Sequence, residues 1–398
     1  MQNVKQTNQP PAASELVVIG AGVVGAATAF HAARAGLQPL VVEAREAPCT
    51  LTTPAATGAY RLQFDNKDEL EMVRETVAML EDFSEVTGQT TFDLRLRRQG
   101  YLWATTDERR AQEQKELVAR QHSWGQTDIE LLDQAEVLRR FPYISPAVIR
   151  ARFRAGDGFL DPKALTMGLL AGSGAEVVTR CRVTGFRIQG GKLTAVETSL
   201  GVIGCDQAVI ACGPFSGEVS ELAGVSLPVE ILRRHKVVIP EEPLVPPDAP
   251  MTIDDDTGTH WRPALAGALL LYADPTTRPS PPVEEVPAEH DYAVKILEPT
   301  SPQAAARISP FWSEVWARGT ANWLMQSGQY TMTPDHRPLI DETGVGGLWV
   351  NTGYSGHGIM GGPAGSRHLV DLIINRAERE ANPFRLDRKF QHRSSERL

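Results

Sequence analysis

The chain has 398 residues, enough for two or three domains that each bury a core. Hydrophobic residues make up 42% of the sequence and charged residues 22%, as in an ordinary soluble globular protein. A formal net charge of −9 argues against nucleic acid as a partner, and no apolar run is long enough to span a membrane.

Neither the first residues nor the cysteines suggest secretion or metal binding. Residues 1–13 are polar and lack the apolar core of a secretory signal, so we expect a disordered lead-in. The four cysteines, Cys49, Cys181, Cys205 and Cys212, have neither the spacing of metal ligands nor the density of a disulfide framework. We therefore expect small buried thiols, no metal site and a cytoplasmic protein.

The first predicted elements form a dinucleotide-binding unit. Residues 16–19, LVVI, predict a buried parallel strand, and residues 20–25 follow it as a G-x-G-x-x-G turn. A helix is predicted over residues 23–35, and a second strand over residues 39–42 ends at the acid Glu43. Because strand, turn, helix, strand and acid occur in the expected order, the match is much stronger than the glycine motif alone.

Each part of this unit has a physical role toward a bound dinucleotide. Gly20 allows the tight turn, Gly22 lets the backbone approach a pyrophosphate, and Gly25 lets the helix pack close to the sheet. The helix N-terminus offers amide groups and partial positive charge to phosphate. Glu43 can accept both hydroxyls of an adenosine ribose, and an acid at this position argues against a 2′-phosphate. These features do not separate FAD from NAD.

The next segment contains two kinds of candidate ligand. The loop over residues 44–60 carries hydroxyl side chains, Thr52 and Thr53 among them, that either bond pyrophosphate oxygens or belong to an ordinary loop. Arg61 follows inside the apolar and aromatic segment 58–64. A guanidinium in such surroundings requires an anionic partner, which is either a substrate carboxylate or a structural acid.

Helices and then short strands occupy the middle of the chain. Capping residues predict four helix starts, at Asn66, Asp107, Asp133 and Asp161. From residue 175 the pattern changes to short strands, and the last of them, over residues 207–211, ends in small residues that include Gly213. Small residues at a strand end suit the close approach of a ligand.

The composition changes again at about residue 227. Proline is dense between strand-like pieces up to about residue 313, which predicts a largely antiparallel second domain with long connections. Arg262 in this region is a second cationic candidate for the site. The acids at 254–256 are consecutive in a loop, so we expect them to be solvated and not to bind metal.

A second glycine-rich turn lies near the end of the sequence. A strand leads into residues 353–362, where His357 stands between Gly356 and Gly358, and a helix is predicted over residues 363–375. Backbone amide groups at a helix N-terminus are again directed at an electron-rich group.

Together these segments resemble the FAD-dependent amine and amino-acid oxidoreductases of the D-amino-acid oxidase superfamily. This family includes sarcosine oxidase, glycine oxidase, D-amino-acid dehydrogenase and the β-subunit of dye-linked proline dehydrogenase. The resemblance extends over nearly the whole chain, and its marks are VVIGAGVVGAATA, GAYRLQF, GFLDPKAL, AVIACGPFS, YTMTPDHRPLID and GLWVNTGYSGHGIMGGPAG. The motifs are specific for the family, and none is specific for a substrate.

The resemblance implies an α/β fold with two domains. A discontinuous Rossmann-like FAD-binding domain would comprise residues 14–60, 150–225 and 320–380. An α+β substrate domain with a mostly antiparallel sheet would comprise residues 61–149 and 226–319, and residues 381–398 would form a C-terminal tail.

The resemblance also implies a set of residues around a non-covalently bound FAD. The expected FAD contacts are Gly20, Gly22, Val23, Val24, Gly25, Glu43, Ala44, Arg45, Thr52, Thr53, Arg61, Val183, Gly213, Gly353, Ser355, Gly356, His357, Gly358 and Ile359. The expected catalytic residues are Arg61, Tyr330, His357 and Arg262. A covalent link is not expected, because Gly328 stands where sarcosine oxidase has its flavin-linked cysteine, and residues 51–54 lack the histidine of dimethylglycine dehydrogenase relatives.

The implied reaction is oxidation of the C–N bond of a small amine or amino acid, with secondary or D-configured substrates favoured. A hydride passes to flavin N5, and the imine product hydrolyses. Met360 stands where sarcosine oxidase has a carboxylate-binding lysine. Residues 268–272 lack the lysine that promotes the reaction of that enzyme with oxygen, which favours a dehydrogenase over an oxidase.

Two further functions remain open at this point. One is a dehydrogenase subunit that passes electrons to a partner protein or a quinone, and the other is a non-catalytic assembly or binding protein that retains FAD. An NAD-linked dehydrogenase is disfavoured, because the loop over residues 353–362 would have no role in it.

Overall fold

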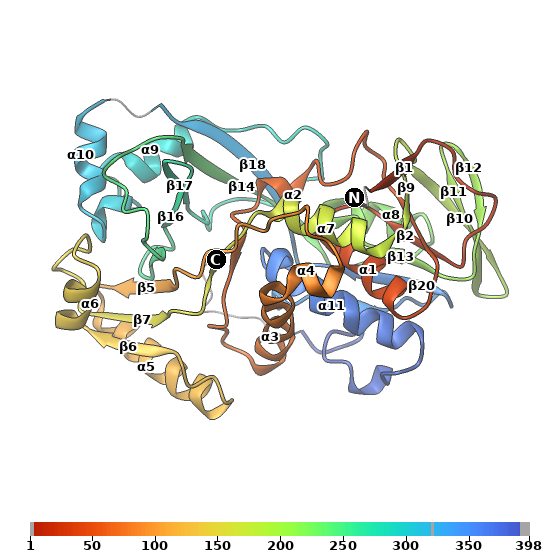
Figure 1. Cartoon of the computed structure of the whole chain (residues 1–398), viewed down its shortest axis with the longest axis horizontal. Coiled ribbons are helices and arrows are strands. Elements are labelled where there is room, and N and C mark those ends of the chain that lie inside the picture. The colour runs from red at the N-terminus through yellow and green to blue at the C-terminus, as the bar shows by residue number, and fades with distance from the viewer. Residues whose placement is uncertain (1–3, 320–321, 391–398) are drawn as a thin grey trace.

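Two large β-sheets dominate the fold and lie toward opposite ends of the molecule, with helices packed around and between them (Figure 1). This computed structural model describes residues 4–319 and 322–390 of the chain. Across these residues, no helix is long and apolar enough to cross a lipid bilayer.

Among the described residues, seven strands form the first sheet. Their order across the sheet is β1 (Lys5–Thr7), β9 (Glu176–Val178), β3 (Pro39–Val42), β2 (Leu16–Ile19), β13 (Ala208–Ile210), β20 (Leu348–Thr352) and β19 (Leu339–Glu342). All neighbouring strands run parallel except β19, which is antiparallel to β20. The predicted strands β2 and β3 are buried along their whole length, as expected where helices or strands cover both faces of a parallel sheet.

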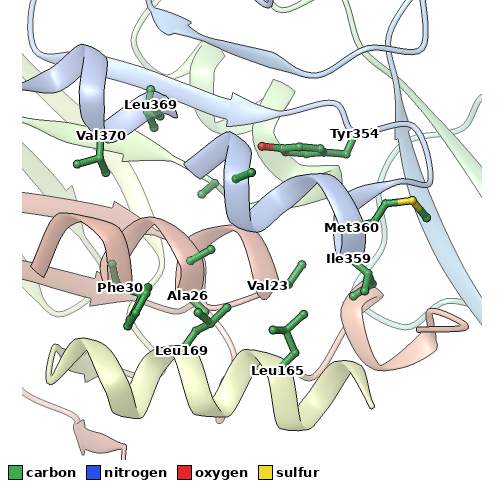
Figure 2. Packing of buried hydrophobic residues seen from close by; sticks show 14 of the residues in the cluster. Val23, Ala26, Phe30, Leu165, Leu169, Tyr354, Ile359, Met360, Leu369 and Val370 are labelled. Carbon is green, nitrogen blue, oxygen red and sulfur yellow. The ribbon is translucent and has the colours of Figure 1, made fainter. Parts of the chain in front are cut away.

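Three helices pack together beside this sheet: α1 (Val23–Arg34), α7 (Pro162–Ser173) and α11 (Gly358–Ile373). Figure 2 shows α1 between the other two, with Phe30 and Leu169 packed on one side and Ile359 beyond its first turn. Small residues such as Ala26 allow this close approach. The predicted start of α7 is confirmed, since Asp161 accepts from the backbone N–H groups of the first turn.

Eight of the described strands form the second sheet. Their order is β18 (Leu324–Met332), β14 (Glu230–Ile239), β17 (Gly267–Leu271), β16 (His260–Ala264), β15 (Met251–Asp254), β5 (Tyr101–Thr105), β7 (Arg150–Arg154) and β6 (Glu130–Asp133). Only the β15–β5 pair is parallel within the described sheet, so the mostly antiparallel sheet is confirmed. The long strands β14 and β18 extend from this sheet toward the middle of the molecule (Figure 1).

Smaller elements complete the described fold. Two minor sheets are formed by β10 (Val183–Gln189), β11 (Lys192–Thr198) and β12 (Gly201–Gly204), and by β4 (Ala59–Tyr60) and β8 (Gly158–Phe159). The other α-helices are α2 (Thr52–Ala55), α3 (Lys67–Glu81), α4 (Phe83–Thr87), α5 (Glu108–Ser123), α6 (Gln134–Arg140), α8 (Ser216–Glu221), α9 (Asp291–Leu297) and α10 (Phe311–Ala317). Asn66, Asp107 and Asp133 cap α3, α5 and α6 as predicted.

The expectation of a disordered lead-in over residues 1–13 is wrong for the part of this segment that the structure describes. Lys5–Thr7 form strand β1, which pairs with β9 at the edge of the seven-stranded sheet. Backbone hydrogen bonds to β9 hold this polar segment, so no hydrophobic pattern in the sequence could reveal it. Residues 1–3 lie outside the described part of the chain.

Sheet membership also moves the expected domain boundaries. β7 and β18 fall within the ranges expected for the FAD-binding domain, yet both pair in the eight-stranded sheet. Conversely, α3 falls within the substrate segment 61–149 but packs against α11 in the core beside the seven-stranded sheet. Long-range strand pairing and helix packing decide these memberships, and composition shifts along the chain do not report them.

The C-terminal region departs from expectation in two places. α11 begins at Gly358 and not at residue 363, so Pro363 lies inside the helix. Within the expected tail, Phe384 is buried and Arg388 pairs with Asp335 at 2.8 Å, so residues 381–390 pack onto the folded domain. Residues 391–398 lie outside the described part of the chain.

The consecutive acids at 254–256 accept hydrogen bonds within the protein, and this corrects the expectation that they are solvated. Asp254 is fully buried and accepts a hydrogen bond from Nε of Arg307 at 2.9 Å. Asp256 accepts from the backbone N–H of Thr106 at 2.9 Å. No cluster of three potential metal ligands occurs among residues 4–319 and 322–390.

Candidate active site

A cavity of about 460 Å³ is lined by residues from both large sheets. One part of its wall follows the carboxyl ends of β2, β3, β13 and β20, and another part comes from side chains of β14 and β18. Ligands of open α/β sheets bind at this edge, and the volume is in the ordinary range for a ligand pocket.

One end of the cavity is built by the first glycine turn and Glu43. The carboxylate of Glu43 accepts hydrogen bonds from the backbone N–H groups of Ala21 at 2.8 Å and Arg45 at 2.9 Å. These bonds fix the carboxylate on the wall, and its remaining lone pairs can accept ribose hydroxyls. α1 begins beside it with no acidic residue in its first turn, so its N-terminus is open to an anion.

Gly25 serves helix packing and does not form part of the cavity wall. A Cβ atom on Gly25 would lie 1.8 Å from the carbonyl oxygen of Gly20. Any larger residue would therefore push α1 away from the turn. Thr53 holds the neighbouring loop against the same helix, since its hydroxyl accepts from the N–H of Val23 at 3.2 Å.

A different part of the wall is formed by the second glycine turn and Tyr330. β20, which precedes this turn, is three strand spacings from β3, roughly 14 Å across the sheet. Gly356 has a φ of +92°, and a Cβ atom on it would lie 2.6 Å from Cε2 of Tyr330. Only glycine lets the tyrosine ring lie on the loop, because its backbone is left-handed and its surface is bare.

His357 and Arg61 meet at this part of the cavity. Nη2 of Arg61 lies 3.2 Å from Nε2 of His357. Arginine can only donate, so Nε2 accepts, and a neutral imidazole then carries its proton on Nδ1. Nδ1 lies 3.7 Å from a carboxylate oxygen of Glu69, which is too long for a hydrogen bond.

Arg61 is held on several sides. Its Nη1 donates to the carbonyl oxygen of Gln63, and its guanidinium lies 4.4 Å from the ring centroid of Phe64 and 5.5 Å from that of Trp103. These contacts fix the guanidinium and therefore fix the imidazole of His357 that it touches.

The structure brings most of the predicted site residues together. All expected FAD contacts except Gly25 line the cavity, namely Gly20, Gly22, Val23, Val24, Glu43, Ala44, Arg45, Thr52, Thr53, Arg61, Val183, Gly213, Gly353, Ser355, Gly356, His357, Gly358 and Ile359. Tyr330 also lines it.

Arg262, expected to be catalytic, does not line this cavity. Its Nε and Nη2 donate to the carbonyl oxygen of Thr57 at 2.9 and 2.6 Å, and its guanidinium stacks 4.4 Å from the ring centroid of Phe159. The guanidinium is thus used to hold a loop behind the wall, and the expectation for Arg262 is corrected.

Sequence reasoning missed Arg234 and Lys236, which line the cavity from β14. Lys236 is 5% exposed, and burial together with the nearby Arg262 lowers the pKa of its ammonium to about 7. Two cations spaced two residues apart in a strand share one face, which is the signal that could have identified them. Lys236 also pairs with Leu271 of β17, so the absence of lysine from residues 268–272 does not leave that part of the wall without one.

The residues on the wall fit FAD. The N-termini of α1 and α11 lack acidic residues in their first turns, which suits a pyrophosphate and the negative charge of a reduced flavin. Glu43 supplies acceptors for ribose hydroxyls at the end of β3. This strand is three strand spacings from β20, and that separation suits an extended dinucleotide. The Nδ1 of His357 is buried and has no hydrogen-bond partner among the described residues.

Comparisons with known proteins find related chains along nearly the whole sequence. The chain is 25% identical over 421 residues to FAD-dependent oxidoreductase domain-containing protein 1 of Xenopus laevis, a match that covers 92% of this chain and 80% of that protein. It is 26% identical over 403 residues to mitochondrial sarcosine dehydrogenase of Mus musculus, covering 97% of this chain. This chain spans 42% of the length of that dehydrogenase.

A solved structure and a family model extend the comparison. Glycine oxidase from Geobacillus kaustophilus has the same fold, with a TM-score of 0.81 at 21% identity, and the match covers 96% of this chain and all of that one (100%). The family model described as "FAD dependent oxidoreductase" (DAO) matches residues 15–372. The chain therefore belongs to the DAO family of FAD-dependent oxidoreductases.

Proposed function

We propose that this protein oxidises the C–N bond of a small amino acid, either N-substituted or D-configured, to an imine that water then hydrolyses. FAD, when bound, supplies the redox chemistry by accepting a hydride at N5. The hydride carries two electrons and one proton away from carbon, a second proton leaves the nitrogen, and water supplies the oxygen of the carbonyl product.

The observation that carries this proposal is the composition of a single cavity. Its wall combines a dinucleotide site around Glu43 with a second helix N-terminus at α11 and a group of aromatic and cationic side chains from the eight-stranded sheet. A non-catalytic protein that retained FAD would need the first of these features and would have no use for the last.

The residues near His357 have separable tasks in this proposal. Arg61 holds the imidazole of His357 in one tautomer, so that Nδ1 carries the proton. The Tyr330 ring closes the space above the loop at Gly356, and burial raises the pKa of Tyr330, so its hydroxyl stays protonated. Apolar residues such as Leu271 and Met360 on the same wall limit access of water to the reacting carbon.

The names of relatives support the substrate class. The curated relatives include sarcosine dehydrogenase and dimethylglycine dehydrogenase, and a solved relative is glycine oxidase. Small amino acids, several of them N-methylated, are common to these names. This chain spans 42% of the length of either dehydrogenase, so their activities enter here only as support for a proposal.

A second candidate is a dehydrogenase that passes electrons to a partner protein or a quinone. The dehydrogenase relatives favour this candidate. The absence of lysine from residues 268–272 no longer favours a dehydrogenase over an oxidase, because Lys236 lies beside Leu271. Hydrogen peroxide formed in stoichiometric amount with product would identify an oxidase. A cytoplasmic location remains our prediction for either case.

Product analysis tests the proposed reaction. With sarcosine, oxidation of the methyl carbon yields formaldehyde and glycine, whereas oxidation of the α-carbon yields glyoxylate and methylamine. D-Amino acids would yield 2-oxo acids and ammonia. Formation of one of these pairs in equal amounts supports the proposal, and absence of all of them across N-methyl, secondary and D-amino acids would contradict it.

A further inference from the structure

Two cations on β14 point toward the cavity from the same face of the sheet. Arg234 and Lys236 are two residues apart, so their side chains leave the strand on one side. The register places Leu232 opposite Tyr330 and Lys236 opposite Leu271, and both of these partners also line the cavity. The face that carries Arg234 and Lys236 is therefore a wall of the site.

Neither cation has a carboxylate partner among the described residues. The Nζ of Lys236 donates to the carbonyl oxygen of Ala56 at 3.2 Å, and Nη1 of Arg234 donates to the backbone carbonyl of Asp274 at 3.3 Å. The carboxylate of Asp274 instead pairs with Lys295 at 3.1 Å. Nε of Arg234 is buried and has no hydrogen-bond partner in the described structure.

Arg233, the residue next to Arg234 on the strand, differs from the two cations because it has an acidic partner. Arg233 leaves the opposite face of β14 and pairs with Glu289 at 3.3 Å. Within the described residues, the cation that faces away from the cavity thus has an ion pair within 4 Å, and the two that face into it have none. A cation that is buried, as Lys236 is, or half-buried, as Arg234 is, costs free energy when it has no counterion, and a bound anion would offset that cost.

The position of these cations matches the reacting end of the site. The Arg234 guanidinium lies 5.9 Å from the ring centroid of Tyr330, and Tyr330 lies on the loop at Gly356 next to His357. Arg61, for which a substrate carboxylate and a structural acid were both open as partners, contacts Gln63 and His357. An anion bound by Arg234 and Lys236 would therefore lie beside the loop at Gly356 and not at the end of the cavity near Glu43.

We propose that Arg234 and Lys236 bind the carboxylate of the substrate, and that Arg61 is a positioning residue for His357. The proposal rests on the proposed function and narrows it, because it selects amino acids with a free carboxylate over simple amines and amino-acid esters. Arginine offers a planar pair of donors for the two carboxylate oxygens, and lysine retains two further donors after its bond to Ala56.

The test measures carboxylate binding without turnover. Acetate and its neutral analogue acetamide are titrated into the FAD-loaded protein, and binding is followed by calorimetry and by the change in the flavin spectrum. The variants are Lys236→Met, Arg234→Gln and Arg61→Met, with Arg233→Gln as the matched control from the opposite face. Flavin content and Tm establish that each variant is folded, and Lys236→Arg tests whether charge alone restores binding.

The expected result is a loss of acetate affinity of about 10- to 100-fold in Lys236→Met and in Arg234→Gln. Acetamide binding, the Arg233→Gln control and Lys236→Arg should differ little from the original protein. Equal acetate affinity in all variants, or a loss confined to Arg61→Met, would overturn the assignment. A protein whose acetate site depends on both cations but whose flavin no amine reduces would retain this inference and reject the proposed function.

Discussion

Arg61 and His357 are 296 residues apart in sequence, yet both line the cavity, and Nη2 of the arginine lies 3.2 Å from Nε2 of the histidine. The first residue follows the loop of the opening nucleotide-binding unit, and the second belongs to the turn that begins α11. This contact joins the two glycine turns, and it sets the proton of a neutral His357 on the nitrogen that has no other bond.

Loss of this contact should lower catalysis more than binding. We expect Arg61→Met and His357→Ala to reduce the rate of flavin reduction about 100-fold, because the imidazole is misplaced or absent. Flavin content and acetate affinity should stay close to those of the original protein. Rapid-mixing absorbance measures the rate, and the exposed Arg139→Met serves as the control. Normal rates in both site variants would contradict the role given to this pair.

Replacement of Gly25 by alanine should prevent normal FAD binding. The new Cβ atom would lie 1.8 Å from the carbonyl oxygen of Gly20, so the turn and α1 must separate. We expect a loss of about 1–3 kcal/mol in the free energy of unfolding and a protein purified with little flavin. Gly344→Ala is the matched control, since no atom lies within 4 Å of its added Cβ. Full flavin content in Gly25→Ala would show that the packing argument is wrong.

The flavin should be released by acid precipitation. Gly328 lines the cavity without a nucleophilic side chain, and the thiols of Cys49 and Cys212 are poor nucleophiles because burial raises their pKa values to about 11 and about 12. Trichloroacetic acid should leave a colourless pellet and a yellow supernatant. Colour that stays in the pellet after unfolding would indicate a covalent link.

Acetate affinity should depend on pH through Lys236. Burial and the positive charges of Arg262 and Lys163 lower the pKa of Lys236 to about 7, so the ammonium form is lost as pH rises through that value. Over this range His260 and Tyr330 stay neutral, since burial lowers the pKa of His260 to about 4 and raises that of Tyr330. We expect affinity to fall between pH 7 and pH 9 by up to about tenfold per unit.

The same group predicts a matching change in stability. Between the folded pKa of about 7 and the ordinary value of 10.5 the unfolded chain binds more protons, so this group makes the free energy of unfolding rise with pH across that window. Below pH 7 Lys236 is charged in the folded protein, so the free-energy cost of burying this charge lowers the stability in full. Both pH dependences should flatten in Lys236→Met, and curves that match the original protein would contradict the assignment.

The nucleotide-binding end of the site could be predicted because its signal is local. The strand before Gly20, the helix after Gly22 and the acid Glu43 lie within a short stretch, and each residue type has a backbone or hydrogen-bonding reason to be there. The turn at Gly356 could be predicted for the same reason. These parts of the sequence define their own geometry, and the structure places nearly all of them on the cavity wall.

The substrate side could not be predicted because it depends on pairing between distant strands. Arg234 and Lys236 face the cavity only because β14 pairs with β18 and β17, which are far away in the chain. Arg262 is also a basic residue on a strand of this sheet. Strand register and a hydrogen bond to the carbonyl oxygen of Thr57 nevertheless direct its side chain behind the cavity wall. Asp254 was expected to be solvated, because nothing local indicates Arg307 as its partner.

The most direct test of the account is the visible spectrum of the FAD-loaded protein, recorded without oxygen while amines are added. The panel pairs sarcosine, proline, D-alanine and D-proline with their methyl esters and with simple amines that lack a carboxylate. The account predicts bleaching of the yellow flavin by one class of carboxylate-bearing substrate and little or none by the matching esters and amines. A flavin that no member of the panel reduces, or a protein that cannot be loaded with FAD, would contradict it.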